Sequence, residues 1–113
     1  MDLSQKTCVP CRQGDPPLPE GRVRELSQSV PGWSLVPGEP KLRREFKFRD
    51  FGSAIAFVNK VAAVAEREDH HPDILVHYDR VTLVLWTHAI GGLSENDFIL
   101  AAKINTIRPQ RAA

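Results

Sequence analysis

The chain has 113 residues, of which 42% are hydrophobic and 26% are charged, and its formal net charge at pH 7 is +1. This length suffices for one domain with its own core, and the composition is that of a globular protein rather than a disordered one. Because 15 basic residues balance 14 acidic ones, nothing points to a nucleic-acid partner. No apolar run reaches the ~20 residues of a membrane span and no secretory signal is apparent, so we expect a cytoplasmic protein without membrane contact.

The first 19 residues are predicted to form an extended, proline-rich lead-in to a domain that spans residues 20–113. Pro10, Gly14 and a run of prolines from Pro16 onward disfavour helix in this segment. Cys8 and Cys11 lie in it as well. Two thiolates are only half of a structural zinc site, and a redox dithiol needs a βαβ context, so we interpret both cysteines as part of a solvent-exposed tail.

Hydrophobic periodicity predicts the first half of the domain. Apolar residues at helical spacing over 20–30 indicate a short helix that ends at Pro31-Gly32, and a short strand is expected over 33–36. Residues 41–48 alternate between apolar and charged side chains, which is typical of a half-buried strand. The predicted inner face of this strand carries Leu42, Phe46, Phe48 and, as an exception, Arg44.

The longest predicted element is a helix from an N-cap at Asp50 to about Glu66. Its expected apolar stripe consists of Phe51, Ala54, Ile55, Val58, Val61, Ala62 and Ala65. Two β-rich runs follow, over residues 73–78 and 80–87, and the short link between them predicts a hairpin. The second run is apolar on both faces, so we expect a second subunit to cover the face that the helices leave open.

Ser94 and Asp97 have the spacing of a capping box and predict the start of a last helix. The buried stripe expected for this helix consists of Leu100, Ile104 and Ile107. The element order α-β-β-α-β-β-α predicts an α+β two-layer sandwich, with an antiparallel four-stranded sheet and three helices on one face.

Three of the four histidines fall where predicted elements meet. His70 and His71 follow the long helix and precede Pro72, which favours an extended backbone and therefore points the two side chains to opposite sides. His88 ends the second strand of the hairpin. Because imidazole gives and takes a proton near neutral pH, several such groups around one pocket suit a reaction that removes one proton and protonates a leaving group.

The whole chemical pattern resembles the signature of the pterin-4a-carbinolamine dehydratase family. The residues that carry it are Glu66, His70-His71-Pro72, Tyr78, His88 and Asp97. Gly32-Trp33, the strand over 42–48 and residues 92–97 extend the resemblance over most of the chain, from about residue 20 to residue 107. It implies an α+β sandwich that forms homodimers or homotetramers.

The resemblance also implies the reaction and the roles of the site residues. His70, His71 and His88 would line the pocket as the catalytic and substrate-binding residues, with His71 and His88 favoured for proton transfer and His70 mainly holding the substrate. Glu66 and Asp97 would orient imidazoles. The reaction would be loss of water from a 4a-hydroxytetrahydropterin to give a quinonoid dihydropterin, in support of tetrahydrobiopterin recycling. It involves no redox change, so no cofactor and no metal is expected.

Two other interpretations compete with this one. Glu66, His70 and His88 could form a two-histidine, one-carboxylate metal site. Alternatively, the chain could be a non-catalytic dimerisation or assembly cofactor that binds a protein partner, as some relatives in the family are. A pure binding module has little use for three clustered imidazoles, so the histidines favour the enzyme. His77 is interpreted as a surface residue or a satisfied core residue, and Trp33 and Trp86 as packing residues.

Overall fold

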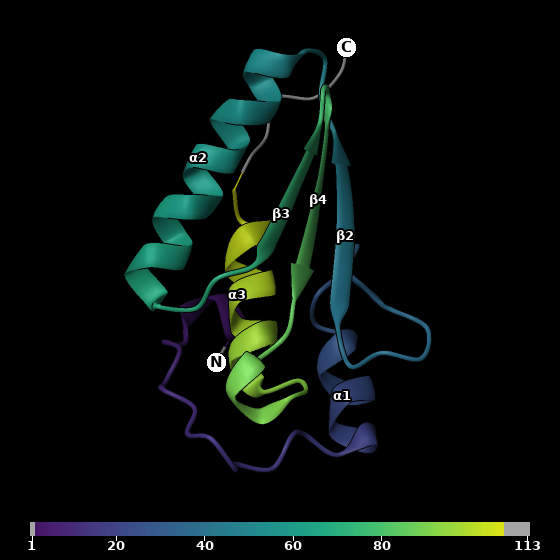
Figure 1. Ribbon diagram of the computed structural model, residues 1–113, viewed down its shortest axis with the longest axis vertical. Coiled ribbons are helices and arrows are strands. Elements are labelled where there is room, and N and C mark those ends of the chain that lie inside the picture. The colour runs from purple at the N-terminus through teal and green to yellow at the C-terminus, as the bar shows by residue number, and fades with distance from the viewer. Residues whose placement is uncertain (1, 108–113) are drawn as a thin grey trace.

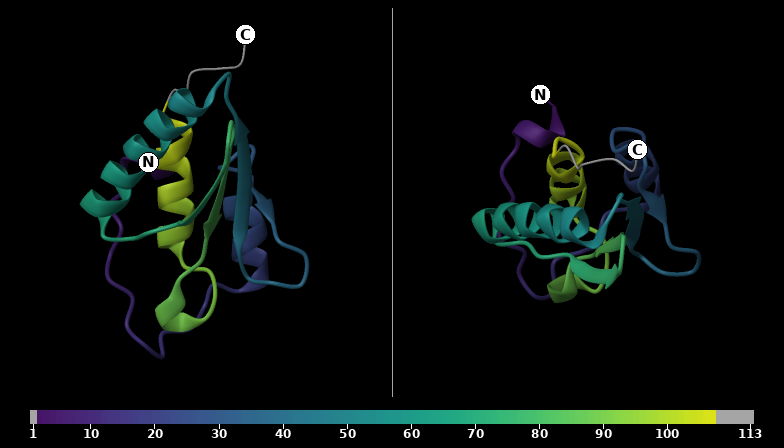
Figure 2. Two further views of the ribbon diagram at one scale, coloured as in Figure 1. Left: turned by 45° about the horizontal axis from the view of Figure 1, so that its top comes forward. Right: turned by 90° about the horizontal axis from the view of Figure 1, so that it is seen from above.

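Four antiparallel strands form one sheet, in the order β1-β2-β4-β3, in the computed structural model, which describes residues 2–107 (Figure 1). The strands are β1 (Ser34–Leu35), β2 (Leu42–Lys47), β3 (Asp73–His77) and β4 (Arg80–Leu85). The helices are α1 (Glu20–Ser27), α2 (Phe51–Glu68) and α3 (Glu95–Asn105), with 3₁₀ turns at Leu3–Gln5 and His88–Ile90. Figure 2 shows α2 and α3 on the same side of the strands. The predicted α+β two-layer sandwich is confirmed.

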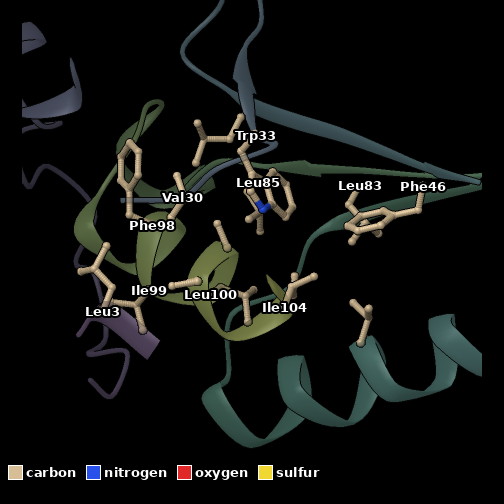
Figure 3. Packing of buried hydrophobic residues seen from close by; sticks show 14 of the residues in the cluster. Leu3, Val30, Trp33, Phe46, Leu83, Leu85, Phe98, Ile99, Leu100 and Ile104 are labelled. Carbon is tan, nitrogen blue, oxygen red and sulfur yellow. The ribbon is translucent and has the colours of Figure 1, made fainter. Parts of the chain in front are cut away.

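The inner face of the sheet follows the alternation predicted from the sequence. Leu42 and Phe46 of β2 face the core beside three buried residues of β4, namely Val81, Leu83 and Leu85. Figure 3 shows how Leu85 and Leu83 pack toward the buried side chains of α3, among them Leu100 and Ile104. The opposite face, where Thr82 and Val84 lie, is only half-buried.

Arg44 keeps its place on the inner face because its charge finds partners at the edge of the core. The guanidinium donates to Asn105 Oδ1 at 2.6 Å and to the Pro31 carbonyl at 3.3 Å, and it packs over the ring of Phe46 at 4.5 Å. Asn105 Oδ1 also accepts a hydrogen bond from Trp33 Nε1 at 2.8 Å. The network satisfies each polar group that it buries, and it confirms that Trp33 is a packing residue.

Helix α2 begins as predicted, because the Asp50 carboxylate accepts a hydrogen bond from the Ser53 N–H at 2.7 Å. Its buried stripe differs from the prediction: Phe57 is buried, whereas Phe51 is 51% exposed and Ala62 is exposed. A straight helix over a twisted sheet buries only a narrow stripe of side chains. Phe51, the first residue of α2, lies outside the core, where it stacks on Tyr78 with ring centroids 6.5 Å apart.

Other boundaries shift by a few residues. Helix α1 ends at Ser27 rather than at Val30, although Val30 remains fully buried in the turn that follows. The hairpin turn consists of Tyr78 and Asp79, one residue earlier than expected, with Tyr78 at φ 54°. Within residues 2–107, no helix is both long and apolar enough to cross a membrane.

The N-terminal segment lies against the domain instead of projecting from it. Leu3 is buried in the core, and Lys103 of α3 donates to the Ser4 carbonyl at 2.9 Å. Cys8 is half-buried against the same core, so the interpretation of an exposed tail is wrong for this residue. Figure 1 shows the segment passing one end of α3 on its way to α1. Its anchors are too widely spaced to give a periodic sequence pattern, which is why only the tertiary structure reveals them.

Candidate functional site

A cavity of about 410 Å³ opens where the end of α2, the turn after β4, the start of α3 and the N-terminal segment meet. All three histidines singled out from the sequence line it. The full lining consists of Val9, Pro10, Cys11, Asp69, His70, His71, Pro72, Asp73, Trp86, Thr87, His88, Ala89 and Asn96. Glu66 and Asp97 are not part of the wall, but each contacts a histidine that is.

His70 is held by a buried carboxylate. Helix α2 ends at Glu68 and is capped by Asp69, whose left-handed backbone (φ 52°) turns the chain so that His70 follows directly at the cavity. His70 Nε2 lies 2.7 Å from Asp97 Oδ1. A carboxylate only accepts hydrogen bonds, so Nε2 carries the proton and Nδ1 is the remaining ring nitrogen.

Asp97 is itself fixed by two further donors. Its Oδ2 accepts from Thr87 Oγ1 at 2.8 Å and from the Ser94 N–H at 2.9 Å, the second bond being part of the predicted capping box. The side chain is fully buried. Asp97 therefore both caps α3 and orients His70, and one carboxylate ties together the start of the helix, the end of the hairpin and the cavity wall.

His71 lines the same cavity as His70 but pairs with a different carboxylate. Its Nε2 lies 2.5 Å from Glu66 Oε2, one turn back on α2. The side chains of His71 and Glu66 are 52% and 76% exposed, so this pair is solvated, in contrast to the buried pair of His70 and Asp97. Hydrogen bonding of Nε2 to the carboxylate leaves Nδ1 of His71 as the nitrogen available to a bound molecule.

His88 is positioned by an aromatic ring rather than by a carboxylate. It begins the 3₁₀ turn after β4, and its imidazole lies against the Trp86 ring, with centroids 3.8 Å apart and the ring planes tilted by 31°. Within residues 2–107 the His88 imidazole has no hydrogen-bond partner. Lys41 lies over the same indole at 4.9 Å. Trp86 is therefore more than a packing residue, and only its adjacency to the Thr87-His88 sequence could have indicated this.

No local pattern in the sequence indicates that the N-terminal segment takes part in the cavity. Val9, Pro10 and Cys11 line it, and Asn96 at the start of α3 joins them. These residues meet the histidines only through long-range contacts, since more than 50 positions separate Cys11 from His70 in the chain.

The predicted metal set is not assembled as a unit. Glu66 pairs with His71, and His70 pairs with Asp97. Among residues 2–107 there is no group of three His, Cys, Asp or Glu side chains that could hold a metal ion. What the geometry does assemble is three imidazoles on one cavity, each with a different neighbour, and such a set is suited to proton transfer.

Comparison with known proteins gives one consistent result. The family described as pterin 4 alpha carbinolamine dehydratase matches residues 16–107. A protein of Stenotrophomonas maltophilia (strain K279a), provisionally named pterin-4-alpha-carbinolamine dehydratase, is 50% identical over 97% of this chain and 95% of its own length. A protein of Halorhodospira halophila with the same provisional name is 49% identical over 95% of this chain and 98% of its own.

Two solved structures extend the comparison. The crystal structure of a transcriptional coactivator/pterin dehydratase from Brucella melitensis superimposes with a TM-score of 0.75 at 38% identity, over 79% of this chain and 95% of that one. A pterin dehydratase-like protein, described as a RuBisCO assembly factor in the alpha-carboxysome, shares the fold with a TM-score of 0.56 at 24% identity, over 66% and 86% of the two chains. With a matching sequence and a matching fold, the chain belongs to the pterin-4-alpha-carbinolamine dehydratase family.

Proposed function

We propose that this protein is a lyase that removes water from a 4a-hydroxytetrahydropterin and releases a quinonoid dihydropterin. The observation that carries the proposal is the set of three imidazoles on one cavity, two of them oriented by carboxylates. Family membership supports the choice of substrate. Such an enzyme would serve tetrahydrobiopterin recycling, in the cytoplasm.

The chemistry needs one proton removed and one proton delivered. The proton on the ring nitrogen next to C4a is taken up by a base, the C4a–O bond breaks, and the leaving hydroxyl receives a proton from an acid and departs as water. Electrons stay within the ring system, so nothing is oxidised or reduced overall. A positioned acid or base of this kind typically accelerates a reaction by ~10²–10⁴-fold.

His71 is the base in this proposal and His88 the acid. The hydrogen bond from His71 Nε2 to Glu66 leaves Nδ1 unprotonated in the neutral ring, so Nδ1 can accept the substrate proton. His88 has no carboxylate partner within residues 2–107, and it delivers its proton from a ring held by Trp86. His70, locked by Asp97, positions the substrate rather than moving a proton.

A homodimer or homotetramer is part of the same proposal. The face of the sheet away from the helices forms a shallow groove lined by Arg43, Glu45, Leu75, His77, Arg80, Thr82 and Val84. Leu75 is exposed there and Val84 only half-buried, so a second subunit would gain by covering them. Sedimentation equilibrium distinguishes an oligomer from a monomer.

The proposal is tested with freshly generated 4a-hydroxytetrahydropterin in a stopped-flow dehydration assay. We expect the wild type to accelerate water loss, and His71→Gln and His88→Gln to lose at least ~10²-fold of that acceleration. Arg24→Gln is the control, because Arg24 forms an exposed ion pair on α1 and lines neither the cavity nor the groove of the sheet. If the wild type is no faster than buffer, the dehydratase proposal fails and a role in binding a protein partner takes its place.

A further inference from the structure

We propose that the N-terminal segment Cys8–Cys11 is a wall of the pterin site, clasped in place by Asn96, and that it sets how tightly substrate is held. This inference rests on the proposed function and adds a substrate-retaining element to it. Three consecutive residues of the segment line the same cavity as the three histidines. The histidines alone would leave that side of the cavity without a wall.

The side-chain amide of Asn96 pairs with the backbone of Val9 in the way that a neighbouring β-strand would. The Val9 N–H donates to Asn96 Oδ1 at 2.9 Å, and Asn96 Nδ2 donates back to the Val9 carbonyl. Because both bonds require this one orientation of the amide, the side chain has a single well-defined rotamer. Asn96 Nδ2 also lies 3.4 Å from Cys11 Sγ. The Asn96 side chain is buried, so these bonds are shielded from competing water.

A second set of contacts holds the segment at Cys8, one residue before Val9. The Cys8 N–H donates to Glu68 Oε1 at 2.9 Å, and Cys8 Sγ lies 3.7 Å from the Asn96 carbonyl. Glu68 belongs to the last turn of α2 and Asn96 to the first turn of α3. The segment therefore bridges the two helices whose ends carry His70 and Asp97, and its position is coupled to the geometry of the site.

This arrangement gives the two cysteines different properties. Burial, followed by the negative charge of Glu68, raises the pKa of the Cys8 thiol to about 12, so Cys8 is unreactive at neutral pH. Cys11 is partly exposed, and it faces the cavity. A pterin in the cavity would cover Cys11. Among the described residues, the hydrogen bonds of the segment go to Asn96 and Glu68 and not to a histidine, so we expect the wall to affect substrate affinity rather than the proton-transfer step.

The direct test is protection of Cys11 from alkylation by N-ethylmaleimide, followed by peptide mass spectrometry, with 7,8-dihydrobiopterin as the probe. Its Kd is measured first by quenching of tryptophan fluorescence. At ten times the Kd, Cys11 alkylation should slow about 11-fold, as the free fraction of the site falls to about one in 11. If the probe binds but Cys11 alkylation is unchanged at a saturating concentration, the proposed wall is refuted and the dehydratase proposal still stands. Absence of binding contradicts both.

A substitution gives an independent kinetic test. Asn96→Ala releases the segment, and KM for the 4a-hydroxytetrahydropterin should rise about 5- to 10-fold, the loss expected from one or two neutral hydrogen bonds, while kcat stays within about twofold. Arg24→Gln is the control, because Arg24 forms only an exposed ion pair on α1. An unchanged KM in a folded Asn96→Ala protein, or a fall in kcat alone, contradicts the proposed role of the segment in holding substrate. The alkylation test uses the wild type, so it does not depend on whether a variant folds.

Discussion

Replacement of Asp97 by asparagine tests whether one buried carboxylate holds both the fold and the site. The wild-type carboxylate accepts three hydrogen bonds, from His70, Thr87 and Ser94. Asparagine has nearly the same volume but only one acceptor oxygen. The Thr87 and Ser94 donors converge on Oδ2, so the amide oxygen takes that place and the NH₂ group turns toward His70 Nε2. Two donors then face each other unless His70 changes tautomer.

The magnitude follows from the bonds affected. One charge-assisted hydrogen bond is lost, and such bonds contribute about 1.5–3 kcal/mol to stability. Two others change from a charged to a neutral acceptor, which weakens each by roughly half. We therefore expect Asp97→Asn to lower the free energy of unfolding by about 2–4 kcal/mol, a large fraction of the roughly 5–15 kcal/mol of a typical domain.

The loss is measured by urea unfolding at pH 7, followed by tryptophan fluorescence. Glu95→Gln is the matched control, since Glu95 lies in the same first turn of α3 but forms half-exposed ion pairs, with Lys6 at 2.9 Å and with Arg22 at 3.7 Å. That substitution should cost no more than about 1 kcal/mol. If Asp97→Asn costs no more than Glu95→Gln, the buried carboxylate does not organise this region, and our account of the His70 environment is refuted.

Three further predictions concern other parts of the molecule. Glu66→Gln should change the free energy of unfolding by no more than about 0.5 kcal/mol, because the ion pair between Glu66 and His71 is exposed. The same substitution should lower the dehydration rate in the stopped-flow assay, and a rate equal to that of the wild type would contradict the role of Glu66. Cys8 titrates at 9.0 when unfolded and at about 12 when folded, so its stabilising contribution is complete below pH 9.0 and is lost as the pH rises toward 12. The wild type should thus lose stability relative to Cys8→Ser in urea unfolding above pH 9.0, and parallel curves would contradict the burial of this thiol. Gly32→Ala should lower the free energy of unfolding, measured by thermal unfolding, by about 1–3 kcal/mol, because Gly32 has φ +89° and an added Cβ would lie 2.6 Å from Arg44 Cζ. An unchanged stability would contradict this, since it would mean that Arg44 moves aside at little cost.

Local sequence signals predicted most of the fold because they act over short distances. Asp50 and the Ser94–Asp97 box cap their helices through contacts three residues apart, and alternation alone predicted the inner face of β2. Phe57 could not be distinguished from Phe51 in this way. Both positions are apolar and near the expected stripe, and the path of α2 over the twisted sheet decides which of them is buried.

The residues of the candidate site could be predicted from the sequence, but the contacts between their side chains could not. The spacing of His70, His71 and His88 matched a family signature, whereas the pairing of each ring with Asp97, Glu66 or Trp86 depends on how α2 meets the loop after β4. The wall formed by the N-terminal segment was missed altogether. Its clasp by Asn96 joins residues 87 positions apart, and no local pattern records such a contact.

The central claim, that two imidazoles act as base and acid on one substrate, is tested most directly by the pH dependence of kcat/KM. The wild type should give a bell-shaped profile, because the base must be unprotonated and the acid protonated for the reaction to proceed. A base must be unprotonated to act, so His71→Gln should lower the rate and abolish the decline on the acidic side. A flat wild-type profile, or one that His71→Gln leaves unchanged in shape, would contradict the account.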